Sequence, residues 1–219
     1  MSSGQERPVD EQRPPAWLVV ATVAAKAALL LVVVQVALDP GWGNLEGKAP
    51  TARAITYPLL AVVVPLWHLL RGRFRPDRRY AWGADLLVTL PGFSDLLGNR
   101  WDLYDRVSWF DDAVHLVNTG FLAAAVLLLV GLAGARLRWR LAVAIAVGTT
   151  LSLVWELWEF TAFVAKGAES ATAYADTLGD LTLGWLGAVA AAVAVGAPRA
   201  PDPVGTTSDA GRGSAPRTR

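Results

Sequence analysis

Long apolar stretches separated by short polar segments are the main feature of the sequence. A helix crosses roughly 30 Å of hydrocarbon with about 20 mostly apolar residues. Stretches near this length occur at residues 16–38, 53–70, 81–99, 109–133, 139–165 and 173–196. The pattern predicts an all-α polytopic membrane helix bundle, with about six transmembrane helices in a single domain at residues 16–197.

The composition agrees with a membrane protein. Of the 219 residues, 53% are hydrophobic and 18% are charged, and the mean hydropathy is +0.36. These values are too apolar for an ordinary soluble domain. The two ends, residues 1–15 and 198–219, are instead rich in Pro, Ser, Gly and charged residues, and we expect disordered tails there.

Several kinds of site are excluded by the residues that the sequence lacks. There is no cysteine, which rules out disulfides, thiolate metal ligands and cysteine nucleophiles. There is also no glycine-rich phosphate loop and no basic patch interleaved with aromatic residues. We therefore expect the lipid bilayer as the main partner, and no nucleic acid.

The basic residues indicate how the predicted helices are oriented, because short cytoplasmic loops are enriched in Lys and Arg. If the N-terminus is cytoplasmic, six helices place 14 basic residues on the cytoplasmic side, including the runs at 71–79 and 136–140. The opposite side then holds five: Lys48, Arg53, Arg100, Arg106 and Lys166. With five helices the two arginine runs would lie on opposite sides. We therefore expect six helices with both termini in the cytoplasm.

The third apolar segment, residues 81–99, is the least hydrophobic and contains Asp85 and Asp95. Pro91 and Gly92 should kink or interrupt it, which membrane proteins tolerate inside a bundle. Lys26, near the middle of the first segment, is expected to pair with a carboxylate in preference to extending its stem toward the interface.

In the last segment, small residues such as Gly184 and Gly187 favour close helix packing.

Ionisable side chains in the last three apolar segments are the strongest functional signal. Such groups cost several kcal/mol in hydrocarbon unless they pair, bind an ion or line a wet cavity. At about 1.5 Å per residue, His115 and Glu159 lie roughly 9 Å below the outer helix ends, Asp180 about 11 Å and Glu156 about 14 Å. Three helices are thus predicted to bring ionisable groups to one depth.

The spacing of these groups favours one shared pocket, because residues three or four apart lie on the same helix face. Helical bundles hold metals with Glu and His side chains from facing helices, and an oxygen-rich set with one imidazole suits Mg, Mn, Zn or Fe. The candidate metal ligands are His115, Glu156, Glu159 and Asp180, the candidate catalytic residues are Asp112 and Glu159, and the supporting residues are Asp111, Asp176, Asp95 and Asn118.

A structural role is the alternative for each of these groups. Asp111 and Asp176 lie near helix ends, where water can solvate a carboxylate. The deeper residues His115, Glu156, Glu159 and Asp180 can be held by structural hydrogen bonds. Carboxylates that pack together must take up protons or share a cation.

The same positions carry a resemblance to a known family. The segments LYDRVSWFDDAVHLVNTGF (103–121), WELWEF (155–160) and DTLGDLTLGWLGA (176–188) resemble the D-x-x-H, E-x-x-E and D-x-x-x-D-x-x-x-x-x-x-G motifs of the YjdF-like family of bacterial inner-membrane proteins, whose function is unknown. With the third segment, the similarity covers about residues 80–196. A looser similarity connects the pattern to VanZ-like membrane proteins, which are linked to glycopeptide resistance.

The resemblance implies a multipass protein of the bacterial inner membrane, with a connection to the outer leaflet or the cell envelope. It supplies no reaction, because family likeness does not establish function.

Three functions are compatible with the sequence. In the first, a divalent-cation site opens outward and binds or acts on an envelope lipid or small phosphorylated molecule, with Asp112 orienting His115 and one carboxylate serving as general base toward water. In the second, the same groups relay protons in a small-solute transporter, and Asp85 and Lys26 extend the polar path toward the cytoplasm. In the third, the charges lock the helices of a noncatalytic scaffold together.

Overall fold

The computed structural model describes residues 14–72, 79–162, 164 and 173–196. These residues form seven α-helices and no strand: α1 (Ala16–Leu38), α2 (Pro50–Gly72), α3 (Trp82–Arg100), α4 (Leu103–Arg106), α5 (Phe110–Leu129), α6 (Leu137–Ala162) and α7 (Ala173–Ala194). Except for Pro14 and Pro15, the tails expected to be disordered lie outside the described residues.

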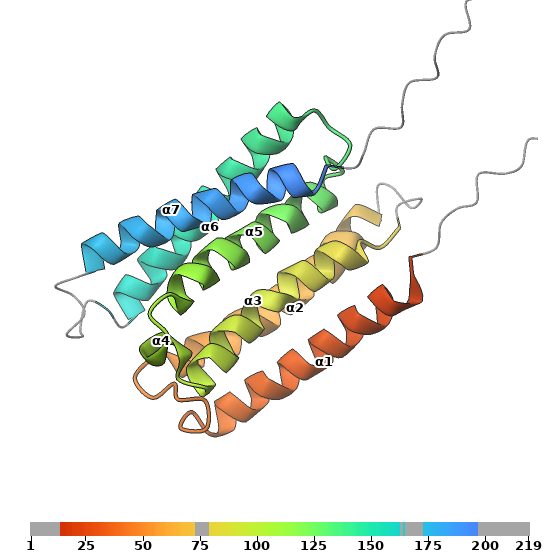
Figure 1. The fold of residues 1–219 in the computed structure, drawn as a ribbon. Coiled ribbons are helices and arrows are strands. Elements are labelled where there is room, and N and C mark those ends of the chain that lie inside the picture. The colour runs from red at the N-terminus through yellow and green to blue at the C-terminus, as the bar shows by residue number, and fades with distance from the viewer. Residues whose placement is uncertain (1–13, 73–78, 163, 165–172, 197–219) are drawn as a thin grey trace, which may run out of the picture.

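Five of the described helices, α1, α2, α5, α6 and α7, are long and apolar enough to cross a membrane. They contain 20 to 26 residues, which corresponds to about 30 to 39 Å at a rise of 1.5 Å per residue. They run side by side in one bundle (Figure 1). The prediction of an all-α polytopic membrane bundle is confirmed.

Helix α3 has the length of a span, 19 residues, but it is not among the helices that are apolar enough to cross a membrane. It packs against α1, α2 and α5 and buries the polar side chains of Asp85, Thr89, Asp95 and Asn99. Because its neighbours cover it, α3 exposes little surface to lipid and needs less apolar character than the other helices. The expectation that this segment lies inside the bundle is confirmed.

The helix continues through Pro91 and Gly92 from Trp82 to Arg100, so of the two expected outcomes, a kink or an interruption, the interruption is wrong. Gly92 packs closely against neighbouring helices, because a Cβ there would lie only 2.8 Å from Leu29 and 3.2 Å from Tyr57.

The two ends of the bundle differ in charge. At one end, which we call the arginine-rich end, α2 and α5 finish and α3 and α6 begin, and Arg71 donates a hydrogen bond to Leu129 O at 2.8 Å. Both described chain ends lie at this end (Figure 1). At the opposite end, which we call the acidic end, α5 begins with Asp111 and Asp112 and α7 begins with Asp176 in its first turn.

Lys26 pairs with a carboxylate, as the sequence predicted. Its Nζ lies 2.7 Å from Asp85 Oδ1 and donates to Ala61 O, and Tyr80 donates to the other oxygen of Asp85. The pair ties α1 to α3, and α2 supplies the carbonyl.

Glycines allow α5, α6 and α7 to approach closely, which confirms the packing predicted for Gly184 and Gly187. A Cβ at Gly187 would collide with Leu116 O, and one at Gly184 would collide with Ser152 Oγ. At Gly148 a Cβ would lie 2.5 Å from that of Ala188. These contacts lie just below the ionisable groups and bring the three helices that carry them together.

Candidate functional site

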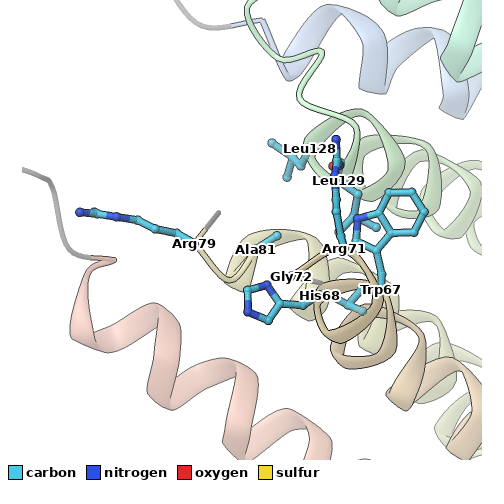
Figure 2. A pocket seen from close by; sticks show the side chains of 9 residues that line it. Trp67, His68, Arg71, Gly72, Arg79, Ala81, Leu128 and Leu129 are labelled. Carbon is cyan, nitrogen blue, oxygen red and sulfur yellow. The ribbon is translucent and has the colours of Figure 1, made fainter. Parts of the chain in front are cut away.

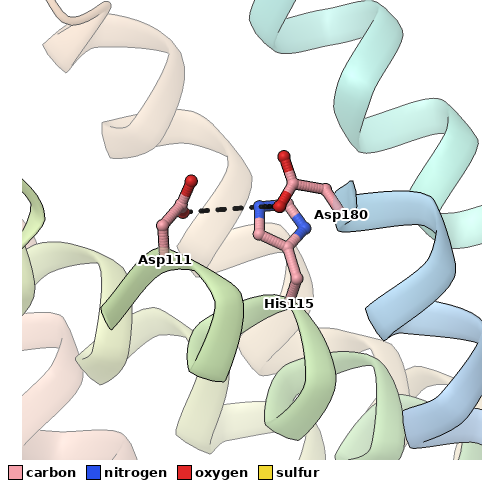
Figure 3. A group of neighbouring side chains, drawn as sticks. All are labelled: Asp111, His115 and Asp180. Atoms are coloured by element: carbon pink, nitrogen blue, oxygen red, sulfur yellow. Dashed lines mark ion pairs between the residues drawn. The ribbon is translucent and has the colours of Figure 1, made fainter. Parts of the chain in front are cut away.

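The imidazole of His115 is the centre of the ionisable group. Its Nε2 lies 3.5 Å from Asp111 Oδ1 and 3.7 Å from Asp180 Oδ1, and its Nδ1 lies 3.6 Å from Glu156 Oε1. These residues come from α5, α6 and α7. Figure 3 shows Asp111 and Asp180 beside the ring of His115. Three helices therefore bring ionisable groups together around one imidazole.

The ligand atoms form two sets, one on each side of the ring. Asp111, His115 and Asp180 form the first set, and His115, Glu156 and Glu159 form the second; within each set these atoms lie within 4.8 Å of one another. Two atoms bound to one ion at about 2.1 Å lie roughly 3.0 Å apart in an octahedron and about 3.4 Å apart in a tetrahedron. The spacing around His115 is slightly wider and fits a cation after small side-chain movements.

Glu156 has a buried oxygen without a hydrogen-bond partner. The residue is 7% exposed, and its Oε2 accepts a hydrogen bond from Thr177 at 3.1 Å. Its Oε1, beside the imidazole, accepts no hydrogen bond from the described residues. A buried polar atom without a partner costs free energy, so this oxygen is suited to a ligand.

The candidate catalytic residue Asp112 lies outside this group. It is exposed on α5, and the carboxylate at the imidazole is that of Asp111. Both aspartates lie within about one helical turn of His115, and the contact that the structure shows is that of Asp111. The expectation that Asp112 orients His115 is therefore wrong, and the supporting residue Asp111 takes that position.

Two other supporting residues lie near the group. Asp176, exposed in the first turn of α7, lines the cavity described below, as does Asn118. Asn118 accepts a hydrogen bond from Ser94 of α3 at 2.9 Å, and the hydroxyls of Thr119 and Ser152 are 3.1 Å apart one turn deeper.

The last supporting residue, Asp95, belongs to a separate ion pair. Both of its oxygens contact Arg53, at 2.7 Å from Nε and 3.1 Å from Nη2. Tyr57 donates to the same carboxylate, and Asn99 donates to it at 3.2 Å. The hydrogen bonds of Asp95 thus go to Arg53, Tyr57 and Asn99, and none of these is a candidate ligand. The charge of Asp95 is matched by a guanidinium, whose bidentate geometry suits a carboxylate.

A cavity of about 750 Å³ is lined by both sets of charges. Arg53, Tyr57 and Asp95 line it, and so do His115 and Glu159. This volume is within the range of about 300 to 1,000 Å³ that is typical of ligand pockets. The cavity can enclose a small polar group beside both the guanidinium of Arg53 and the acidic residues around His115.

Tyr104 of α4 also lines this cavity, at its outer end. Burial, reinforced by the charge of Asp95, raises the pKa of the Tyr104 phenol well above its usual value. The phenol therefore stays neutral at physiological pH, and its ring packs edge-on against Phe110 with centroids 4.9 Å apart.

A second cavity, of about 80 Å³, lies at the arginine-rich end (Figure 2). Trp67, His68 and Arg71 of α2 line it, with Leu128 and Leu129 of α5. Arg71 lies over the ring of Trp67 at 5.4 Å. This end holds the other histidine of the chain, far from His115 along the bundle.

Three residues of the larger site were missed by the sequence analysis. Arg53 was counted only as one of the basic residues on the outer side, but it is 4% exposed in the first turn of α2. Tyr57, one turn later, shares its face, and Thr177 holds Glu156. The spacing of Arg53 and Tyr57 was visible in the sequence, but nothing there identified Asp95 as their partner.

The fold and the site define a polytopic helical membrane protein with a buried group of acidic residues around one histidine. Residues 17–199 match the family described as "Predicted membrane protein (DUF2238)", and the chain belongs to this family. The match agrees with the YjdF-like resemblance. No curated protein and no solved structure matches the chain significantly.

Proposed function

We propose that this protein binds a divalent cation through His115 and the surrounding carboxylates, and that the cavity beside this site receives a polar or phosphorylated ligand of the cell envelope. The arginine-rich end is then cytoplasmic, and the acidic end faces outward in the bacterial inner membrane. Asp111, His115 and Asp180 form the ligand set closest to Nε2 of the imidazole.

The observation that carries the proposal is the buried, unpartnered Oε1 of Glu156. It lies 3.6 Å from His115 Nδ1, so it can accept the second N–H of a histidine that holds a cation through Nε2. Metal-bound histidines commonly use a carboxylate in this way, which fixes the orientation of the ring. Glu159, on the cavity wall, is then placed to accept a proton from water or from the ligand.

The geometry favours this proposal over the transporter hypothesis. A transporter would need the polar path to continue toward the arginine-rich end. There, however, Asp85 is held by Lys26 and Tyr80, and the cavity ends at the apolar side chains of Leu60 and Leu122. The polar residues around His115 therefore lie toward the acidic end of the bundle.

Metal analysis of the purified protein tests the proposal. The wild type should contain about one metal per chain after exposure to Mn²⁺ or Zn²⁺ and removal of the excess, and His115→Ala should lose it. The matched control is His68→Ala, since the chain has only two histidines and His68 lies at the other end. At a Mn²⁺ concentration 100 times Kd, binding should stabilise the wild type by about 2.7 kcal/mol.

Two results would contradict the cation site. One is wild-type protein without bound metal whose thermal stability does not change with Mg²⁺, Mn²⁺ or Zn²⁺. The other is equal metal binding by His115→Ala and the wild type.

A further inference from the structure

The large cavity is charged near the acidic end, and leucines line its deep end beside the hydroxyls of Thr119 and Ser152. Lys48 and Arg53 line its outer part, whereas Leu60, Leu122 and Leu151 line its deepest part. At about 1.5 Å per residue, these leucines lie roughly 15 to 18 Å from the helix ends nearest the cavity mouth. A ligand that fills the cavity therefore needs a polar end and an apolar end.

The cavity is bounded by two helices that belong to different packing groups. Helix α2 packs against α1 and α3, whereas α6 packs against α5 and α7. Both α2 and α6 nevertheless line the cavity. The cavity thus reaches the side of the bundle, between these two helices, as well as its acidic end.

Apolar side chains on α6 line the cavity and also reach the surface of the bundle. Leu151 is 37% exposed, Val154 57% and Phe160 46%, and all three line the cavity. In a helix long and apolar enough to cross a membrane, exposed aliphatic residues face lipid. The α6 side of the cavity is therefore bordered by side chains that face hydrocarbon, as entry of a ligand from the bilayer would require.

The polar part of the cavity suits an anion. The guanidinium of Arg53 lies 5.4 Å from the ring of Trp158 on α6, so it reaches across the space between the two helices. A cation bound at His115 would place a second positive charge on the lining of the same cavity. Phosphate oxygens bind well between a guanidinium and a metal ion, because both favour oxygen ligands with negative charge.

From this geometry we infer that the ligand is a membrane amphiphile with a phosphate headgroup, which enters sideways from the bilayer between α2 and α6. The inference rests on the proposed function, because it places the headgroup between Arg53 and the cation site. The headgroup occupies the outer part of the cavity, and the chain follows the apolar side chains toward Leu60 and Leu151.

Binding of a short-chain lipid tests this inference. Full-length protein in phosphatidylcholine nanodiscs is titrated with dihexanoylphosphatidic acid and, separately, with inorganic phosphate, with and without Mn²⁺. The amphiphile should bind at least tenfold more tightly than inorganic phosphate. Leu151→Trp, which fills the deep end, should weaken amphiphile binding at least tenfold and leave Mn²⁺ binding unchanged.

The matched control is Leu157→Trp. Leu157 lies on the same helix and is 57% exposed, but it does not line the cavity, so both ligands should bind as in the wild type. Retained Mn²⁺ binding also shows that each tryptophan variant is folded.

The inference is overturned if inorganic phosphate binds as tightly as the amphiphile, or if Leu151→Trp binds the amphiphile normally. A wild-type protein that binds no Mn²⁺ would contradict the proposed function and not the lipid cavity. If this wild type still binds the amphiphile and Leu151→Trp does not, the lateral lipid cavity is supported and the cation site is rejected.

Discussion

Buried carboxylates have different partners in the two halves of the bundle. In the half formed by α1, α2 and α3, Asp85 lies 2.7 Å from Lys26 and Asp95 lies 2.7 Å from Arg53. In the half formed by α5, α6 and α7, four carboxylates surround one imidazole: Asp111, Glu156, Glu159 and Asp180. The first half pairs each buried acid with a basic side chain, and the second gathers acids around a single titratable base.

Burial alone does not separate the halves. Asp85 and Asp95 are 1% and 4% exposed, and Glu156 and Asp180 are 7% and 4% exposed. The difference lies in the partners. An ion pair with further hydrogen bonds is complete by itself, whereas packed carboxylates require protons or a cation. The carboxylates of the first half therefore hold helices together, and those of the second are suited to a ligand; Arg53 both pairs with Asp95 and lines the cavity.

The largest effect is expected from breaking an ion pair of the first half. Asp85→Asn should lower the free energy of unfolding by about 3 to 5 kcal/mol, because it leaves the partly buried Lys26 charge without its carboxylate. Unfolding of the detergent-solubilised protein in denaturant measures this loss. The double variant Lys26→Met/Asp85→Leu should stay within about 1 to 2 kcal/mol of the wild type. Equal losses in both variants would mean that the pair is not the source of the stability.

A smaller loss is expected from separating the helices of the second half. Gly187→Ala should cost about 1 to 3 kcal/mol of stability, because its Cβ would collide with Leu116 O and push α7 from α5. The Mn²⁺ affinity should fall as well, since Asp180 moves away from His115. Gly179→Ala on the same helix is the control: its Cβ meets nothing within 4 Å, so stability should be equal or higher. Similar effects of both substitutions would contradict the packing role of Gly187.

Within the second half, removing one charge should change binding more than stability. Glu156→Gln should leave the free energy of unfolding equal or slightly higher, because it removes a buried charge whose Oε1 has no hydrogen bond. Mn²⁺ affinity, measured by calorimetry, should fall about 10- to 100-fold. A large loss of stability with unchanged Mn²⁺ affinity would instead indicate a structural role, as in the first half.

The smallest effect is expected at Asp112. Asp112→Asn should change stability by less than about 0.5 kcal/mol and leave Mn²⁺ affinity unchanged, because the residue is exposed. Asp111→Asn, one residue earlier, should weaken Mn²⁺ binding, since its carboxylate lies 3.5 Å from His115 Nε2. The reverse order, measured in the same titration, would show that Asp112 is the ligand.

The sequence by itself determined the helices and the depth of the ionisable groups. Helix length follows from the thickness of hydrocarbon, and the rise per residue places His115, Glu156 and Asp180 at one level. It also predicted that Lys26 would find a carboxylate, because an isolated charge in the bundle is too costly. Each of these results depends on local properties of one segment.

Only the tertiary structure decided which side chains meet. The packing of α5 against α6 and α7 brings Glu156 and Asp180 to His115, and the packing of α2 against α3 brings Arg53 to Asp95. The cavity likewise arises because α2 and α6 pack against different neighbours. Contacts between helices depend on their relative rotation and spacing, which side-chain packing across the whole bundle sets, and no single apolar segment encodes them.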